Sequence, residues 1–581
     1  MSVDLESGQG KQSAKQALWQ GAALLGGAAL LSKVIGTLQK IPLQNMAGDE
    51  TFGLYSAVYA LAIMWMTLAA AGVPVAVSAL VAERVAASDE HGARRVLRWS
   101  LGLLVASGFV MFAILCVFAE QFASWMGVES AASAIRMSSI ALLFAPATAV
   151  LRGYRQGRME MARPALSQIA EQVARVAFML IMLIYAVRMA WSPASTAAAV
   201  HGGLAAGAVA GLIAMLWRWP WRRTEPIVIR GKGAKSGKAG KPGGAAASDG
   251  ARKVQLPESR GKLLRRIAAV AVPVALASVV APLIGLIDAF SIPRLLGQHS
   301  DTAAALSLSE FGVYNRGIAL NQLVIMAAAG AAAALVPALT AARARGDGES
   351  IVAGAHRATR LAWWFGASAA VGLAVLAQPI NVALFADDNG TIALALLAVA
   401  ALGGTLQAVS SALLQGLGDM RSPAVNLAAA ALLKLALNAA LVPAYGIRGA
   451  AIALAAAFAA AATLNALSLR QRVRLPAPRL SVAGRSAAAL AAMAAAVAAC
   501  ALLLGALTGA LPARASALLT ALPCIAVGAA VFAASLVAFG AALPREWRVL
   551  PGLSGTRVDR WLDRVHTYAD AVSNRNRSKE G

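Results

Sequence analysis

Residues 151–176, LRGYRQGRMEMARPALSQIAEQVARV, join two hydrophobic segments and carry polar side chains into the second one. The connection is basic and contains Arg152, Arg155, Arg158 and Arg163. The helix expected from Pro164 onward is apolar overall, but it includes Gln168, Glu171, Gln172 and Arg175. Their spacing of i, i+3, i+4 and i+7 places these four on one helix face. A polar face inside an apolar helix predicts a buried contact or a binding site.

The same pattern recurs at an offset of 259 residues, so the chain is internally duplicated. Residues 415–425, QGLGDMRSPAV, repeat Gln156, Gly157, Met161, Pro164 and Ala165. Arg175 falls on Lys434, and the motif FGLY at residues 52–55 recurs as FGVY at residues 311–314. Both halves therefore place a basic group inside an apolar helix.

The composition indicates a polytopic membrane protein. Hydrophobic residues make up 59% of the 581 and charged residues only 14%, whereas a soluble protein has roughly 25% charged residues. The net charge of +25 is concentrated in the connections between apolar segments. This distribution is typical of cytoplasmic loops that follow the positive-inside rule, and it does not indicate nucleic-acid binding.

Neither the cysteines nor the histidines predict a metal site or another cofactor. Cys116, Cys500 and Cys524 each lie in an apolar run and form no CxxC motif, which is typical of small core residues. The five histidines are scattered along the chain without the spacing of metal ligands.

The apolar segments number about fourteen and are long enough to cross a bilayer at 1.5 Å per residue. Their connections alternate between short neutral or acidic ones, such as Asp49–Glu50, and basic ones, such as 151–163. This alternation predicts that both termini are cytoplasmic. The expected divisions are a tail (1–16), spans 1–6 (17–221), a linker (222–262), spans 7–12 (263–470), spans 13–14 (485–542) and a second tail (543–581).

An even number of spans in each block means that both repeats begin on the same side of the membrane. The repeats therefore run parallel and are related by an axis along the membrane normal. The linker is rich in Gly, Lys, Ala and Ser, so we expect it to be flexible and its lysines to contact anionic lipids. Residues 556–573 place apolar side chains along one face, which predicts an amphipathic helix on the inner membrane surface.

Charged side chains within the apolar segments mark the expected site, because each costs about 2.5–3.5 kcal/mol at the middle of a membrane. The basic ones are Lys33, Lys40, Arg175, Arg294, Arg316 and Lys434, with Asn315 beside Arg316. The acidic ones are Glu171 and Asp288. An excess of bases predicts a cavity that attracts an anion such as phosphate or pyrophosphate. Two alternatives stay open: Lys40 snorkels to the headgroups, or Glu171 and Arg175 form a structural ion pair at i, i+4.

Three blocks resemble the polysaccharide-transporter branch of the multidrug/oligosaccharidyl-lipid/polysaccharide (MOP) exporter superfamily, and within it the MurJ/SpoVB-like proteins. They are residues 32–84, which begin SKVIGTLQKIPLQNMAGDETFGLY, residues 151–176, and residues 413–451, which begin LLQGLGDMRSPAV. The resemblance implies an all-α fold in which two parallel six-helix repeats form a V-shaped cavity and two C-terminal helices border a lipid groove. Members place basic residues in spans one, two and eight around a pyrophosphate. Lys33, Lys40 and Arg316 match the first and third of these placements, whereas the start of span two has no base.

The implied function is a flippase, not an enzyme, that exports an undecaprenyl-pyrophosphate-linked saccharide across the bacterial cytoplasmic membrane by alternating access. The first choice of substrate is the peptidoglycan precursor lipid II. The expected substrate-binding residues are Lys33, Lys40, Arg175, Arg294, Asn315, Arg316 and Lys434. Asp288 and Glu171 are expected to be coupling or structural charges.

The driving force is left open between the membrane potential, Na⁺ and H⁺. Expected partners are the lipid-linked oligosaccharide, anionic membrane lipids and cell-wall synthesis proteins, with the chain itself a monomer. The alternatives are a flippase for another cell-surface polysaccharide unit, a MATE-type drug or cation antiporter, a polytopic glycosyltransferase and a non-transporting scaffold. A cation antiporter should line its cavity with carboxylates, and a glycosyltransferase needs a catalytic acid or base.

Overall fold

The computed structural model is all-helical over the residues that it describes, which are 21, 24–70, 72–217, 260–297, 301–333, 335–474 and 480–541. The first lobe comprises a helical segment at 24–38, α2 (Lys40–Ala70), α3 (Val73–Ala86), α4 (Glu90–Val117), α5 (Ala119–Met126), η1 (Glu129–Ala131), α6 (Ala132–Ser139), η2 (Ile140–Leu143), α7 (Ala145–Gly157), α8 (Ala162–Arg188) and α9 (Pro193–Leu216). The second lobe comprises α10 (Arg260–Leu296), α11 (Asp301–Ala333), α12 (Leu335–Ala344), α13 (Gly348–Val375), α14 (Ala377–Phe385), α15 (Thr391–Gly416) and α16 (Arg421–Arg472). Two further helices follow, α17 (Leu480–Thr508) and α18 (Ala513–Ala538). The predicted all-α fold is confirmed.

Three predicted segments lie outside the described residues. They are the tail 1–16, all but the last three residues of the linker 222–262, and the tail 543–581 with its amphipathic helix. The predicted boundaries between the repeats and these segments stay predictions.

Among the described residues, eleven helices are long and apolar enough to cross a membrane, or twelve if α13 and α14, bent by 73°, form one span. The two longest of the eleven, Leu24–Ala86 with 63 residues and Arg421–Arg472 with 52, far exceed one crossing, for which about 20 residues suffice. Each contains a glycine with a non-helical backbone and positive φ, Gly48 (φ 77°) or Gly446 (φ 57°), a conformation that glycine adopts readily. The chain can turn back at these glycines. The count of about fourteen spans stays a prediction.

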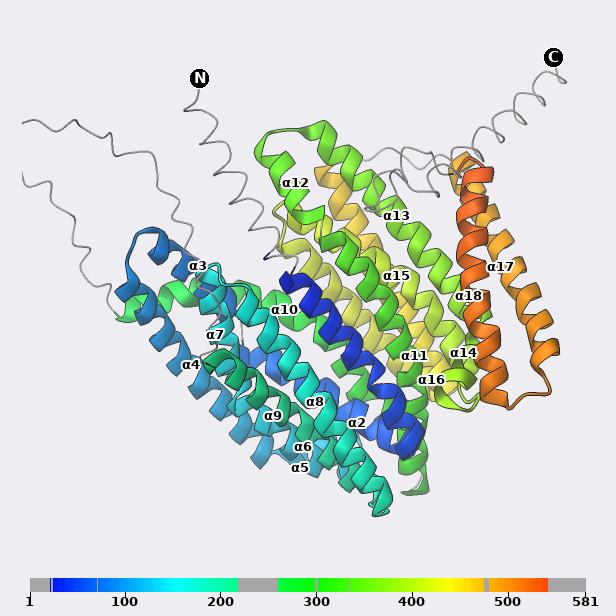
Figure 1. Cartoon of the computed structure of the whole chain (residues 1–581), viewed down its shortest axis with the longest axis horizontal. Coiled ribbons are helices and arrows are strands. Elements are labelled where there is room, and N and C mark those ends of the chain that lie inside the picture. Colours follow the sequence, from blue (N-terminus) through cyan, green and yellow to red (C-terminus); the bar gives the residue numbers. More distant parts are fainter. Residues whose placement is uncertain are drawn as a thin grey trace, which may run out of the picture.

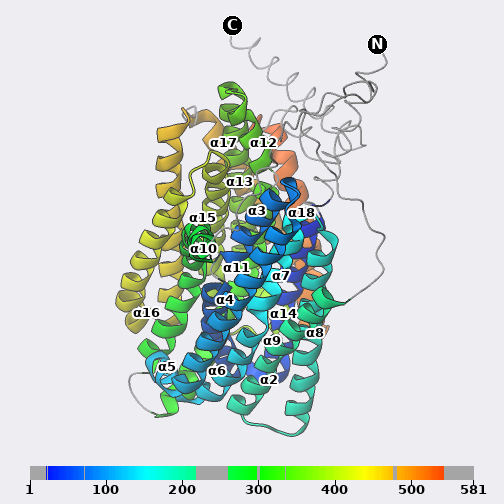
Figure 2. The same cartoon turned by 90° about the vertical axis from the view of Figure 1, so that its left-hand side faces the viewer.

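The two lobes meet where α2 packs against α11, near the middle of the molecule (Figure 1). α10 belongs to the second lobe by sequence but also packs against α2 and α3, so it forms a second contact between the lobes. α17 and α18 pack against each other and against α13 and α14, at the edge of the second lobe away from the first. Seen from the side, most of the long helices share one general direction, with α8 and α16 at opposite edges, whereas part of α10 is seen end-on (Figure 2).

Candidate functional site

A cavity of about 210 Å³ is built mainly from the first lobe. The helical segment 24–38 contributes Lys33 to it, α2 contributes Lys40 and Tyr59, and α8 contributes Arg175. The second lobe contributes Gln322 of α11. The remaining lining residues are Ser32, Gly36, Thr37, Arg152, Gln168, Glu171 and Gln172. The polar face predicted for residues 168–175 therefore does line a cavity, which we call the cationic cavity.

Ion pairing within the cationic cavity leaves an excess of positive charge. Glu171 accepts a hydrogen bond from Arg152 at 2.6 Å. Arg152 is fixed further because it donates to the Ser167 hydroxyl at 2.9 and 3.0 Å. The structure thus pairs Glu171 with Arg152 from the connection and not with Arg175 on its own helix. In the part of the chain that the structure describes, no carboxylate forms an ion pair with Lys33, Lys40 or Arg175.

The Tyr59 ring, which lines the cavity, contacts two of these cations. The Arg175 guanidinium lies 4.9 Å from the centroid of the Tyr59 ring, and the Lys40 ammonium lies 5.9 Å from it. Such cation–π contacts stabilise a charge without neutralising it. One Arg175 amino group and the Gln172 amide nitrogen are buried and have no acceptor in the protein. Three cations and two unsatisfied donors suit an anion with several oxygens.

The second lobe carries the repeat of this arrangement with its charge cancelled. Lys434, the counterpart of Arg175, is fully buried and forms an ion pair with Asp288 of α10. Asp288 also accepts hydrogen bonds from Asn438 at 3.1 Å and from the Tyr314 hydroxyl at 3.1 Å. Lys434 and Asp288 therefore form a buried neutral pair that does not line the cationic cavity.

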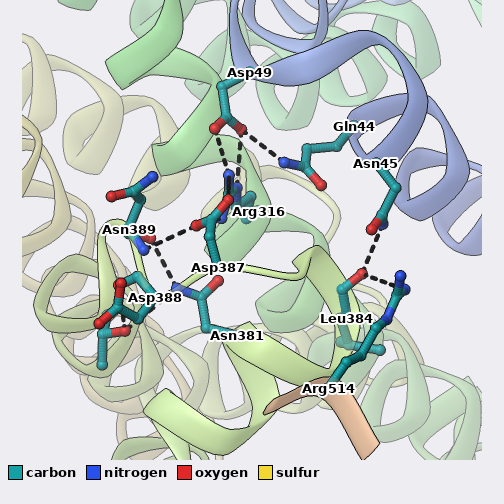
Figure 3. Close-up of polar contacts among 11 residues, drawn as sticks. Gln44, Asn45, Asp49, Arg316, Asn381, Leu384, Asp387, Asp388, Asn389 and Arg514 are labelled. Atoms are coloured by element: carbon teal, nitrogen blue, oxygen red, sulfur yellow. Dashed lines mark hydrogen bonds and ion pairs between the residues drawn. The ribbon is translucent and has the colours of Figure 1, made fainter. Parts of the chain in front are cut away.

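Arg316, predicted to contact the substrate, instead binds two carboxylates at the meeting of the lobes (Figure 3). It forms a two-bond ion pair with Asp49 and donates to Asp387 at 2.6 and 2.9 Å. Only 1% of its side chain is exposed. Asp49 follows Gly48 in the first lobe, and Asp387 follows α14 in the second. We call these three residues the Arg316 cluster.

The electrostatics of the Arg316 cluster favour its ionised form. Partial burial of Asp387 opposes ionisation, but hydrogen bonds from Arg316 and from the Asn389 backbone N–H outweigh it and hold the pKa of the Asp387 carboxyl below its usual value. The Arg316 guanidinium also lies 5.2 Å from the centre of the Phe385 ring. One arginine thus holds a connection of the first lobe and a connection of the second.

Two other predicted residues lie apart from the cationic cavity. Asn315 is buried and donates to the carbonyl of Phe311, one turn earlier on its own helix, at 2.8 Å. Arg294 is exposed near the end of α10, beside Gly127. Sequence reasoning missed Arg152, Tyr59, Asp49 and Asp387. The two aspartates lie in acidic connections, one in each lobe. Acidic residues at these two positions could have predicted a contact with a buried arginine.

The chain is similar in sequence to a known family of membrane proteins. Residues 18–343 match the family model described as polysaccharide biosynthesis protein. The chain is 30% identical over 553 residues to the uncharacterized membrane protein YabM of Bacillus subtilis (strain 168), a match that covers 94% of this chain and 97% of YabM. It is 22% identical over 460 residues to the lipid II flippase MurJ of the same organism, covering 76% and 80%.

Solved structures share the fold. The structure of lipid II flippase MurJ in an inward closed conformation aligns with a TM-score of 0.62 at 12% identity, covering 89% of this chain and 98% of that one. An inward-facing multidrug resistance MATE family transporter of the MOP superfamily aligns with a TM-score of 0.60 at 18% identity, covering 76% and 94%. The predicted two-lobe exporter fold is confirmed by these likenesses.

Proposed function

Because the chain belongs to the polysaccharide biosynthesis protein family, we propose that it is a flippase for an undecaprenyl-pyrophosphate-linked saccharide in the bacterial cytoplasmic membrane. Lipid II is the substrate that we place first, because the similar MurJ of Bacillus subtilis is a lipid II flippase. Another cell-surface polysaccharide unit on the same carrier would present the same pyrophosphate. The cationic cavity therefore supports the assignment of the pyrophosphate carrier and does not distinguish between the saccharides attached to it.

The observation that carries the proposal is the unpaired positive charge of Lys33, Lys40 and Arg175 within an apolar, multi-pass chain. A charge at membrane depth is costly and persists where it has a function. The cavity of about 210 Å³ is smaller than the 300–1,000 Å³ typical of drug-sized ligands. Its size suits a compact anion such as a pyrophosphate group, with the saccharide and the lipid outside it.

In the mechanism that we propose, Lys33, Lys40 and Arg175 bind the pyrophosphate by charge-assisted hydrogen bonds. The polyprenyl chain remains in the bilayer beside α17 and α18. The Arg316 cluster holds the lobes together beyond the cationic cavity, so the saccharide passes only after Arg316 separates from Asp49. The lobes then rock about the repeat axis and expose the pyrophosphate to the other side.

The charge of the cavity argues against the two main alternatives. A drug or cation antiporter would need negative charge where this cavity is positive. A glycosyltransferase would need a free acid or base, and the carboxylate that lines the cavity, Glu171, is held by Arg152. Neither alternative uses the three unpaired cations.

For the driving force, the membrane potential fits the arrangement better than an ion at Asp288. The Asp288 carboxylate already has Lys434 as counter-ion and two further donors. An inside-negative potential drives an anion outward, with about 2.3 kcal/mol per elementary charge per 100 mV. We therefore propose that export of the pyrophosphate is driven by the membrane potential.

The test is complementation in a bacterium whose sole lipid II flippase can be shut off. Wild-type chain should restore growth and the labelling of lipid II on the outer face, and Lys33→Ala with Arg175→Ala should not. Arg136→Ala is the matched control, because Arg136 is a 44% exposed base paired with Glu120 outside the cavity. If the membrane-inserted double variant rescues growth as well as the wild type does, the pyrophosphate site is wrong. If the wild-type chain is inserted and fails to rescue, lipid II is not its substrate.

A further inference from the structure

A second cavity, of about 740 Å³, lies on the other side of the Arg316 cluster from the cationic cavity. α11 shows the order, because Glu310 and Val313 line the larger cavity, Arg316 follows, and Gln322 lines the cationic cavity. α2 repeats it, because Lys40 lines the cationic cavity and Asp49 the larger one. The Arg316–Asp49 ion pair thus separates two chambers.

The larger cavity has the opposite chemistry to the cationic one. Its lining includes the carboxylates of Glu310 and Asp388, the amide of Asn389, the ring of Tyr445 and Arg448. In the described part of the chain, neither Glu310 nor Asp388 forms an ion pair. Carboxylates and amide oxygens accept hydrogen bonds from hydroxyl and amide N–H groups, and the two carboxylates repel a phosphate. A volume within the 300–1,000 Å³ range of ligand pockets leaves room for more than one sugar ring.

The wall that carries Asp388 and Asn389 is held in place by hydrogen bonds between side chains and its backbone. Asn381 donates to the Asn389 carbonyl at 2.8 Å, and the Thr391 hydroxyl donates to the Asp388 carbonyl at 2.7 Å. The Asn389 N–H donates to Asp387 at 2.9 Å. Figure 3 shows how this loop holds Asp387 against Arg316 while Asp388 and Asn389 lie beside it. Residues ordered before a ligand arrives lose less entropy on binding it.

We propose that the larger cavity is a binding site for the uncharged, hydroxyl- and N-acetyl-bearing saccharide of the lipid-linked substrate, after it has passed the Arg316 cluster. This inference rests on the proposed flippase function. The pyrophosphate and the saccharide then bind to chambers of opposite charge. Asp49 belongs both to the larger cavity and to the Arg316 cluster, so a saccharide in the cavity competes with Arg316 for Asp49 and favours separation of the lobes.

The test uses the full-length purified chain in lipid nanodiscs and two soluble probes, an N-acetylated disaccharide without phosphate and inorganic pyrophosphate. Titration calorimetry measures both affinities. Asp388→Ala with Asn389→Ala should lower the affinity for the disaccharide at least 10-fold. The affinity for pyrophosphate should not change, because neither residue lines the cationic cavity and both side chains are exposed. Tyr445 lies on a different helix and is 62% exposed, and Tyr445→Ala should also lower the affinity for the disaccharide. Lys33→Ala should lower the affinity for pyrophosphate alone.

Several outcomes would overturn this inference. One is a wild-type chain that does not bind the disaccharide at millimolar concentration. Another is a disaccharide affinity in both larger-cavity variants that equals the wild-type affinity. The third is an equal loss of disaccharide affinity in Lys33→Ala. Rescue of growth by a chain that does not bind the disaccharide would remove the inference and leave the flippase function in place. Disaccharide binding at the expected residues, in a chain that fails to rescue growth, would support the cavity and remove lipid II.

Discussion

Gly53 of α2 and Gly312 of α11 lie against each other where the lobes cross, and they are equivalent positions of the two repeats. A Cβ atom at Gly53 would overlap the Leu308 carbonyl oxygen, and one at Gly312 would overlap the Asp49 carbonyl oxygen. Leu308 and Asp49 are themselves equivalent at the offset of 259 residues. The contact is therefore reciprocal, as expected if an approximate two-fold axis passes between the two glycines.

The first prediction follows from this close approach. Gly312→Ala should force α2 and α11 apart, because the atoms that a Cβ meets are backbone and cannot move aside. Spin labels on Met46→Cys and Leu306→Cys, exposed positions on either side of the crossing, should lie farther apart in this variant than in the wild type. Double electron–electron resonance measures this distance. Gly330→Ala on the same helix is the control, because no atom lies within 4 Å of its Cβ. An unchanged distance in Gly312→Ala would contradict the lobe contact.

The second prediction concerns Arg316. Arg316→Lys keeps the charge but cannot make two-bond contacts with both Asp49 and Asp387, and Arg316→Ala leaves two carboxylates facing each other. Removing one partner of a buried ion pair typically costs about 3–5 kcal/mol. We expect the thermal midpoint of the purified protein to fall in the order wild type, lysine variant, alanine variant. A midpoint for the alanine variant equal to that of the wild type would mean that the cluster does not join the lobes.

The third prediction is the pH dependence of that cluster. The pKa of Asp387 is lowered in the folded protein, so its stabilisation is complete above the unfolded value of about 3.9 and is lost as the pH falls through the folded pKa. The difference in thermal midpoint between wild type and Asp387→Asn should stay constant from pH 8 to 5 and shrink below about pH 4. A difference that already shrinks near pH 6 would assign the titration to another group.

Helical spacing predicted the polar face of α8, because that face depends only on residues 168–175. It did not predict the partner of Glu171. The i, i+4 rule favours Arg175, worth about 0.2–0.5 kcal/mol, yet tertiary packing brings Arg152 to Glu171 from the preceding connection.

The same reason explains Lys434 and Arg316. Their partners, Asp288 and Asp49, are 146 and 267 residues away in sequence, and a pattern in one sequence does not pair charges across such distances. The repeat did predict that Arg175 and Lys434 are equivalent. It could not show that a carboxylate cancels only one of them.

The fourth prediction uses the Glu171–Arg152 pair. Glu171→Gln removes the carboxylate and frees Arg152 as a fourth unpaired cation, so the affinity of the cationic cavity for inorganic pyrophosphate should rise several-fold. Arg152→Ala leaves Glu171 ionised and unpaired beside the site, so the same affinity should fall. Titration calorimetry on both variants measures the two signs. If both variants weaken binding equally, the pair holds the fold of the cavity and does not set its charge.

The fifth prediction separates a structural from a coupling role for Asp288. Lys434→Met alone leaves a buried carboxylate without its counter-ion, a loss of about 3–5 kcal/mol, whereas Asp288→Asn with Lys434→Met removes both charges and should restore much of the stability. If the membrane potential drives export, the double variant should rescue growth once its thermal midpoint approaches that of the wild type. A stable double variant that no longer exports would instead assign ion coupling to Asp288. Growth and thermal midpoint measured on the same three proteins distinguish these outcomes, because only a coupling role separates the two readouts.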